Sequence, residues 1–545
     1  MDRAYIYKTS ATLLLCLLVS RAAAAPSVAS IESAYADLTD AYGALGLIDS
    51  GFAATYGGKR REEWAKTFEA KRAAVSEGLA SVSMTDISPG DFRAVTVMRE
   101  SVAALVEERS LAPVRKCSEA QQKDLDSDAL RTALYACFDE LANNIGFEGA
   151  KLARVSAFDL LTRINEPERR KALFYAFVPL WRAVNGASEP DSPYRRMIAM
   201  AAADARTKGS AIDAAARTVG VSTAELERWL EQVLGAWRRA SGDSPIEPWD
   251  YRYLGGAADR EIGDAVTLAS MQPLNERYYA DLGASLKAWG VMYDLEPRKG
   301  KAPLAYADYV RRGRLLNGAW RPTVARVSGN YARGGLGPLN ELVHENGHVV
   351  HMMALRTRPA FMDLGDAVFY EAFADVPSWS TYEPAWQQKY LGRRASDAAS
   401  LRALYSNVIL DVAWSLFDLR MLRDPTRDPN VVWTDITSRY LNVVPHPELS
   451  WWAVRVQLAE SPGYMINYGL GAVITAHIRR RITEQLGPFA TGDAHWYAWL
   501  SERLLSSGYE QETATLLREF LGGPVSADAL LQELKRITPT EGESK

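Results

Sequence analysis

Apolar residues recur at spacings of three and four along most of this chain, which is the pattern of amphipathic helices. Alternation typical of strands is scarce, and the best strand candidate is the segment 321–328, which a glycine-rich turn at residues 334–337 follows. The pattern predicts a mainly helical protein with one small β element. The clearest helical segments are residues 31–45, 61–79, 127–143, 167–184, 223–240 and 274–289.

Nothing in the sequence marks a boundary between domains. We find no internal repeat, no low-complexity linker and no long proline or serine tract. The segment 539–545 has the composition of a frayed tail. We therefore predict a single large helical domain over residues 25–545, possessing two lobes.

The N-terminus has the layout of a secretory signal peptide. Arg3 and Lys8 precede an apolar run at 11–19, and small residues occupy 22–25. The run is shorter than the roughly 20 residues that span a bilayer, and no later segment is longer. We predict cleavage after residue 24, no membrane span, and a secreted or periplasmic mature protein.

Composition and charge exclude two broad classes. The chain is 48% hydrophobic and 24% charged, which suits a globular protein with a substantial core and excludes general disorder. Its 63 basic residues are balanced by 67 acidic ones, for a net charge of −4. This balance argues against the basic surface that nucleic-acid binding requires.

The chain has three cysteines, of which Cys16 lies in the predicted signal peptide. In an oxidising compartment the remaining two, Cys117 and Cys137, are a natural disulfide pair. Two separate buried thiols are the alternative, because the sequence does not give the distance between them. Neither cysteine has a partner at metal-binding spacing.

The six histidines are clustered, since none occurs before residue 344 and three fall within 344–351. The helical segment 339–355 contains H-E-x-x-H at His344, Glu345 and His348. Histidines four apart share one helix face and can bind one ion, while the glutamate can accept a proton from water without being a ligand. Gly347 weakens a helix by about 1 kcal/mol relative to alanine, which suggests a packing need or a close approach of backbone or substrate.

A catalytic zinc ion takes three protein ligands and leaves a fourth position open. His351 is one turn further along the helix, and we interpret it as structural or as supporting a ligand. The helical segment 369–378 offers Glu371 and Asp375, which are four apart and share a face. Glu371 would bind the metal, and Asp375 would accept the second ring N–H of a ligating histidine.

These two segments resemble the zinc site of angiotensin-converting-enzyme-type peptidyl-dipeptidases, whose second motif is Phe-x-Glu-Ala-x-x-Asp. The resemblance covers residues 315–480. It implies a two-lobed helical metallopeptidase fold with a deep central groove and one Zn²⁺ per chain. It makes His344, His348 and Glu371 the ligands, Glu345 the base and Asp375 the support of a ligand.

The related thimet oligopeptidase type gives an alternative assignment. In that group the ligand glutamate stands two residues before Pro-Ser, a place that Asp375 holds here. Asp375 would then be the ligand. We favour Glu371, because its motif match is longer and an aspartate reaches one methylene less far.

A third segment, residues 455–468, is similar to the converting-enzyme stretch that ends in two tyrosines. The resemblance implies that Arg455 and Tyr464 bind the substrate's C-terminal carboxylate. It also implies that Gln457 and Tyr468 contact the scissile peptide. Gln457 replaces the family's histidine, and the tyrosines are four apart where the family has three. Tyr468 would donate to the developing oxyanion.

The sequence thus predicts a secreted zinc peptidase that cleaves oligopeptides and releases C-terminal dipeptides. Internal cleavage, as in the thimet type, is one alternative, and a non-catalytic zinc-binding or peptide-binding protein is another. A structural zinc site is disfavoured, because such sites use four ligands that include cysteine. The strand at 324–328 is expected to pair with the substrate backbone.

Overall fold

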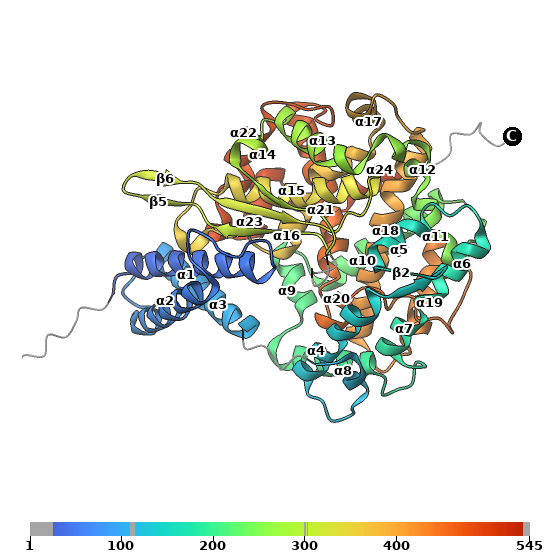
Figure 1. Cartoon of the computed structure of the whole chain (residues 1–545), viewed down its shortest axis with the longest axis horizontal. Helices are drawn as coiled ribbons and strands as arrows, with labels where there is room; N and C mark the ends of the chain where they lie inside the picture. Colours follow the sequence, from blue (N-terminus) through green and yellow to red (C-terminus); the bar gives the residue numbers. More distant parts are fainter. Residues whose placement is uncertain (1–25, 110–114, 243, 299–300, 302–303, 538–545) are drawn as a thin grey trace, which may run out of the picture.

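The computed structural model describes residues 26–109, 115–242, 244–298, 301 and 304–537. The predicted signal peptide and the predicted tail lie outside these residues. The fold is mainly helical, as the apolar spacing predicts (Figure 1). Within the described ranges, no helix has the length and apolar character needed to cross a bilayer.

The first three helices pack together at one end of the molecule (Figure 1). They share a small apolar core with Phe361, which comes from the second half of the chain. Arg358 ties them to that half, because its guanidinium donates to Glu32 at 2.8 Å and to Asp91 at 2.7 Å. Their bounds are α1 (Val28–Asp49), α2 (Arg61–Ser81) and α3 (Pro89–Arg109).

Eleven helices and one short hairpin follow in the described middle of the chain. The hairpin pairs β1 (Ile145–Phe147) with β2 (Ala150–Leu152). The helices are α4 (Ser127–Cys137), α5 (Arg154–Leu161), α6 (Pro167–Tyr175), α7 (Val178–Asn185), α8 (Pro193–Lys208), α9 (Ala211–Thr218), α10 (Thr223–Ala240), α11 (Pro248–Gly255), α12 (Ala257–Ile262), α13 (Leu268–Asp281) and α14 (Leu286–Trp289).

Two segments predicted as single helices are each divided. The segment 167–184 forms α6 and α7, because Pro179 near the start of α7 has no N–H with which to continue the preceding helix. The segment 274–289 forms α13 and α14, because the chain turns at Gly283, where φ is 81°. The other predicted helices are present, and 127–143 continues from α4 into a π turn.

Cys117 and Cys137 form a disulfide, with their Cα atoms 4.3 Å apart. The bond joins a short 3₁₀ turn at Cys117–Gln121 to the last residue of α4. Of the two possibilities that the sequence leaves open, the structure therefore has the paired one. A disulfide is compatible with an oxidising compartment.

A three-stranded sheet, in the order β3–β7–β4, lies beside the helix that carries His344 and His348. Strand β7 (Val324–Ser328) pairs in parallel with β3 (Met292–Asp294) and antiparallel with β4 (Tyr306–Arg311). The prediction that 324–328 pairs with substrate is therefore wrong, because both edges of this strand are occupied. A separate hairpin of β5 (Arg314–Leu316) and β6 (Ala319–Arg321) extends above α1 (Figure 1).

The last ten helices build the larger core together with the helices of the middle of the chain. Its fully buried side chains include Trp386, Trp414, Trp433, Trp452 and Trp496. In Figure 1, α15, α16 and α21 lie together in the middle of the molecule. The bounds are α15 (Leu336–Ala354), α16 (Ala367–Ser378), α17 (Pro384–Leu391), α18 (Asp397–Arg423), α19 (Pro429–Leu441), α20 (Gln457–Glu460), α21 (Ile466–Leu486), α22 (Trp496–Leu500), α23 (Thr513–Leu521) and α24 (Asp528–Leu534).

Candidate metal centre

The histidine-bearing helix α15 begins at a turn that needs glycine. A Cβ on Gly334 would overlap neighbouring backbone atoms, and Gly335 has a φ of 134°, which glycine adopts most readily. The N–H of Leu336 donates to Oδ1 of Asp259 at 2.5 Å, and a carboxylate stabilises a helix N-terminus. These contacts fix where α15 begins and hence where its histidines point.

Helix α15 packs closely against α16, which carries the two acids. A Cβ on Gly347 would meet the backbone of Ala374 at 2.7 Å, so no larger residue fits there without a shift of the helices. The glycine that weakens α15 thus permits the close approach that the sequence suggests. This approach sets the acids of α16 opposite the histidines of α15.

Two histidines and one glutamate meet between these helices. Ligand atoms of His344, His348 and Glu371 all lie within 4.8 Å of one another. The two imidazole centroids are 4.9 Å apart, and Nε2 of His344 is 3.5 Å from Oε2 of Glu371. Among the residues that the structure describes, no other group of three such side chains meets this criterion.

Asp375 lies behind His344 and outside this group. Its Oδ1 accepts a hydrogen bond from Nδ1 of His344 at 2.7 Å, and it also accepts one from Oγ of Ser378 at 3.2 Å. Burial opposes a charge on His344, but the carboxylates of Asp375 and Glu371 outweigh it and raise the His344 pKa well above its ordinary value. The geometry therefore favours Glu371 over Asp375 as the ligand and leaves Nε2 of His344 directed at the group.

His348 is buried, and its Nδ1 has no hydrogen-bond partner among the described residues. Burial and the nearby charge of His344 lower its pKa well below the ordinary value, so the ring is neutral, the form that binds metals. His351 lies between the rings of Phe369 and Phe373, with centroids 5.4 and 5.5 Å away. It is not part of the three-residue group.

Glu345 is 7% exposed and is not part of the group either. Its carboxylate is within hydrogen-bonding reach of the backbone of Ala307 in β4. Burial, together with the carboxylates of Glu341 and Glu371, raises the pKa of Glu345 to about 8. An acid whose pKa is raised towards neutrality therefore stands beside the three-residue group.

The two predicted tyrosines reach the same place, Tyr464 from the turn before α21 and Tyr468 from the first turn of this helix. The hydroxyl of Tyr464 donates to Oε1 of Glu371 at 3.4 Å, and the two tyrosine rings are 5.9 Å apart. Nε2 of Gln457 donates to the hydroxyl of Tyr468 at 3.5 Å. Burial and the charge of Glu371 raise the pKa of Tyr468 well above its ordinary value, so its hydroxyl remains a donor.

Arg455 has a partner that its sequence position does not reveal. Its guanidinium is ion-paired with Asp411 of α18 and lies over the ring of Trp414, 4.7 Å from the centroid. The protein itself therefore supplies a carboxylate to the arginine that we predicted to bind the substrate's carboxylate.

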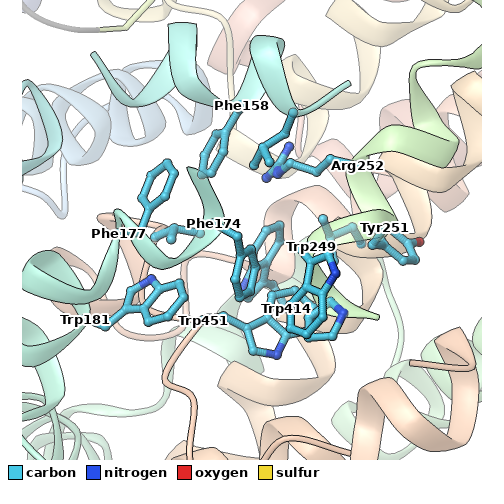
Figure 2. A pocket seen from close by; sticks show the side chains of 13 residues that line it. Phe158, Phe174, Phe177, Trp181, Trp249, Tyr251, Arg252, Trp414 and Trp451 are labelled. Carbon is cyan, nitrogen blue, oxygen red and sulfur yellow. The ribbon is translucent and has the colours of Figure 1, made fainter. Parts of the chain in front are cut away.

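Two further arginines, Arg154 and Arg252, lie near Arg455 and were missed by sequence reasoning. Burial and the charge of Arg455 lower the pKa of Arg154 to about 10 and that of Arg252 to about 9. Arg252 lies over the ring of Phe158 at 3.8 Å and lines an aromatic cavity of about 20 Å³ (Figure 2). That space holds about one water molecule, so it admits no substrate side chain. Its aromatic walls support the guanidinium of Arg252.

These three arginines also line a much larger cavity, of about 740 Å³. Glu341 of α15 is part of its wall, one helical turn before His344 and Glu345. Glu341 stands three residues before His344 and four before Glu345, so it shares their helix face. This spacing is the signal by which the sequence indicates Glu341. Arg154 and Arg252 come from distant helices that carry no motif.

No protein-family model matches this sequence, and no curated protein is significantly similar to it. The interpretation of the site therefore depends on its donor atoms and their geometry. Two imidazoles and one carboxylate in this small space, with an unpartnered Nδ1 on His348, fit a divalent transition metal.

Proposed function

We propose that the protein is an exported zinc-dependent peptidase that hydrolyses oligopeptides. The observation that carries the proposal is the meeting of His344, His348 and Glu371 beside Glu345, a buried acid that is not one of them. Two histidines and a glutamate are a donor set of catalytic zinc sites, which keep a position open. A closed structural site is less suited, because both described cysteines are in the disulfide.

In this proposal His344, His348 and Glu371 would hold the ion, and their neighbours prepare them for it. When bound, Zn²⁺ would polarise the scissile carbonyl and a nearby water molecule. Asp375 holds His344 in the orientation that directs Nε2 at the site. The low pKa of His348 keeps its ring free of a competing proton.

Glu345 and Tyr468 perform the proton and charge chemistry. Glu345 accepts a proton from the attacking water and delivers it to the leaving amine, a role that suits a carboxylate with a raised pKa. The hydroxyl of Tyr468, held by Gln457, donates to the oxyanion that develops on the scissile carbonyl.

The surroundings of the site suit an extended peptide. Among the described strands, β4 is an edge strand, and its residue Ala307 lies next to Glu345. A peptide backbone that pairs with this edge would pass the base. Arg154 and Arg252 face the large cavity and form no ion pair with a described carboxylate, so they suit the C-terminal carboxylate that release of dipeptides requires.

The decisive experiment measures zinc content and peptide cleavage for the wild type, Glu345→Gln and a control. We expect Glu345→Gln to retain zinc and to lose at least about 10³-fold in kcat. Glu69→Gln, on the exposed face of α2, removes the same charge far from the site and serves as the control. Persistent turnover by Glu345→Gln would reject the proposal.

A second measurement decides between the two modes of cleavage. One peptide is digested as its free acid and as its C-terminal amide, and the products are identified by mass. Release of a dipeptide from the acid alone supports the dipeptidase. Equal internal cleavage of both forms supports the thimet-type endopeptidase.

A further inference from the structure

The carboxylates that line the 740 Å³ cavity differ in whether the protein neutralises them. Asp159 is ion-paired with Arg163 at 2.8 Å and with Arg333. Asp259 lies 3.8 Å from Arg163 and accepts the N–H of Leu336. These two acids are therefore occupied by partners within the cavity wall.

Glu341 is the exception. No lysine or arginine in the described ranges forms an ion pair with it, and the hydroxyl of Tyr331, which is neutral, is within hydrogen-bonding reach of its carboxylate. Burial raises the pKa of Glu341, whereas Tyr331 and the charges of His344 and Arg154 lower it. Glu341 is half-buried and lines the cavity. A carboxylate in such a place, with no lysine or arginine in direct contact, is stabilised by a partner that brings a positive charge.

The position of Glu341 relates this carboxylate to the site of cleavage. It lies three residues before His344 and four before Glu345 on the same helix, so the three side chains share one face of α15. One helical turn is about 5.4 Å along the axis, so a substrate side chain next to the scissile bond can reach it. The cavity has room for a lysine or arginine side chain.

Two arginines, Arg154 and Arg252, line the same cavity. Arg154 donates to the carbonyl of Val454 at 3.2 Å, and Arg252 lies over Phe158, so both keep their charge without a carboxylate of their own. The cavity is thus lined by an acid and by two arginines that form no ion pair among the described residues. A peptide end with a basic side chain and a free carboxylate offers a partner of opposite charge to each.

We propose that Glu341 binds the cationic side chain of a lysine or arginine at one of the two substrate residues that follow the scissile bond. This inference depends on the proposed function and specifies its substrate class. It competes with a simpler role in which Glu341 only balances the charge of the arginines. A balancing charge would act on all substrates alike, whereas a binding residue discriminates between them.

The test uses peptides that differ at one position only, with lysine, norleucine or glutamate at either residue after the cleavage site. The value of kcat/KM is measured for each peptide with the zinc-loaded wild type, Glu341→Gln, Glu341→Lys and the control Glu69→Gln. Thermal unfolding and zinc content establish that each variant is folded and loaded. If Glu341→Lys does not fold, the nearly isosteric Glu341→Gln suffices.

We expect the wild type and Glu69→Gln to prefer lysine over norleucine by about tenfold or more at one of the two positions. Glu341→Gln is expected to lose about tenfold more activity on the lysine peptide than on the norleucine peptide, and Glu341→Lys to favour glutamate. Equal losses on all peptides would overturn the inference and leave the peptidase intact. A wild type that cleaves none of them would overturn the proposed function and the inference with it.

Discussion

Gly347 of α15 lies directly against Ala374 of α16: a Cβ on Gly347 would be 2.7 Å from the Cα of Ala374 and 2.9 Å from its carbonyl oxygen. Both contacts are with backbone, which cannot rotate away as a flexible side chain can. The distance between the two helices, and with it the distance between the histidines and Glu371, therefore depends on this glycine.

We predict that Gly347→Ala destabilises the protein by about 1–3 kcal/mol, although alanine is the better helix former. Its zinc affinity should also fall, because α15 and α16 must separate. Gly337→Ala is the matched control, since a Cβ on this α15 glycine meets nothing within 4 Å. Chemical denaturation and zinc titration of both variants check the prediction, and equal stability of the two would contradict it.

The helices were predictable where local pattern alone decides them. The segment 223–240 is present as α10 with the predicted bounds. Its apolar spacing and its N-cap residue Ser222 indicate the same first residue. Two predicted helices are divided at Pro179 and Gly283 by these single residues, and the apolar spacing continues through both positions. The central place of β7 was not predictable, because its neighbour β3 is parallel and comes from a separate segment.

The meeting of His344, His348 and Glu371 was predictable because the spacing of these residues is local within two helices. His344 and His348 share a face of α15, and Glu371 shares one with Asp375 on α16. The partner of Arg455 was not predictable, because Asp411 is 44 residues away and carries no motif. The same holds for long-range electrostatics in general, which the fold creates and the sequence does not display.

Asp375 should control zinc affinity without binding zinc. Asp375→Asn keeps the size of the side chain but removes the charge that orients and polarises His344. Loss of such a partner costs about 10–100-fold in metal affinity. Competition with a chelator measures this, and Asp397→Asn, an aspartate with a side chain 74% exposed, is the control. Unchanged affinity would show that Asp375 has no supporting role.

The two tyrosines should differ in kinetics. Tyr468→Phe removes the donor to the oxyanion, so kcat should fall by about 10²-fold or more at nearly constant KM. Tyr464→Phe removes a 3.4 Å contact with Glu371 and should mainly lower zinc affinity. Steady-state kinetics at saturating zinc separates the two effects. The reverse pattern would exchange the roles of the tyrosines.

Asp418 of α18 is a buried acid that holds the turn before α21. Its Oδ2 accepts the N–H groups of Gly463 at 2.8 Å and Met465 at 3.3 Å, on either side of Tyr464. Its Oδ1 is buried without a partner among the described residues. Burial raises the pKa of Asp418 to about 7, although the two N–H groups oppose this shift.

The sign of the resulting pH dependence follows from proton binding. An unfolded aspartate has a pKa of about 3.9, so between about pH 4 and pH 7 the folded protein holds more protons than the unfolded chain. The free energy of unfolding contributed by Asp418 is therefore fully present below about pH 4 and is lost as the pH rises towards 7. Asp418→Asn cannot titrate, and its contribution should be constant over this range.

We therefore predict that the wild type loses stability relative to Asp418→Asn as the pH rises from 4.5 to 7.5. Denaturant unfolding of both proteins across this range gives the difference in their free energies of unfolding. The contributions of the other titrating groups are the same in both proteins and cancel in this difference. Asp435→Asn, with a side chain 52% exposed on the neighbouring α19, is the control and should run parallel to the wild type. A constant difference between Asp418→Asn and the wild type would mean that Asp418 is ionised in the folded protein at every pH tested. The turn at Tyr464 would then be held by a buried charge, and Asp418→Asn should weaken the contact of Tyr464 with Glu371 equally across the whole pH range.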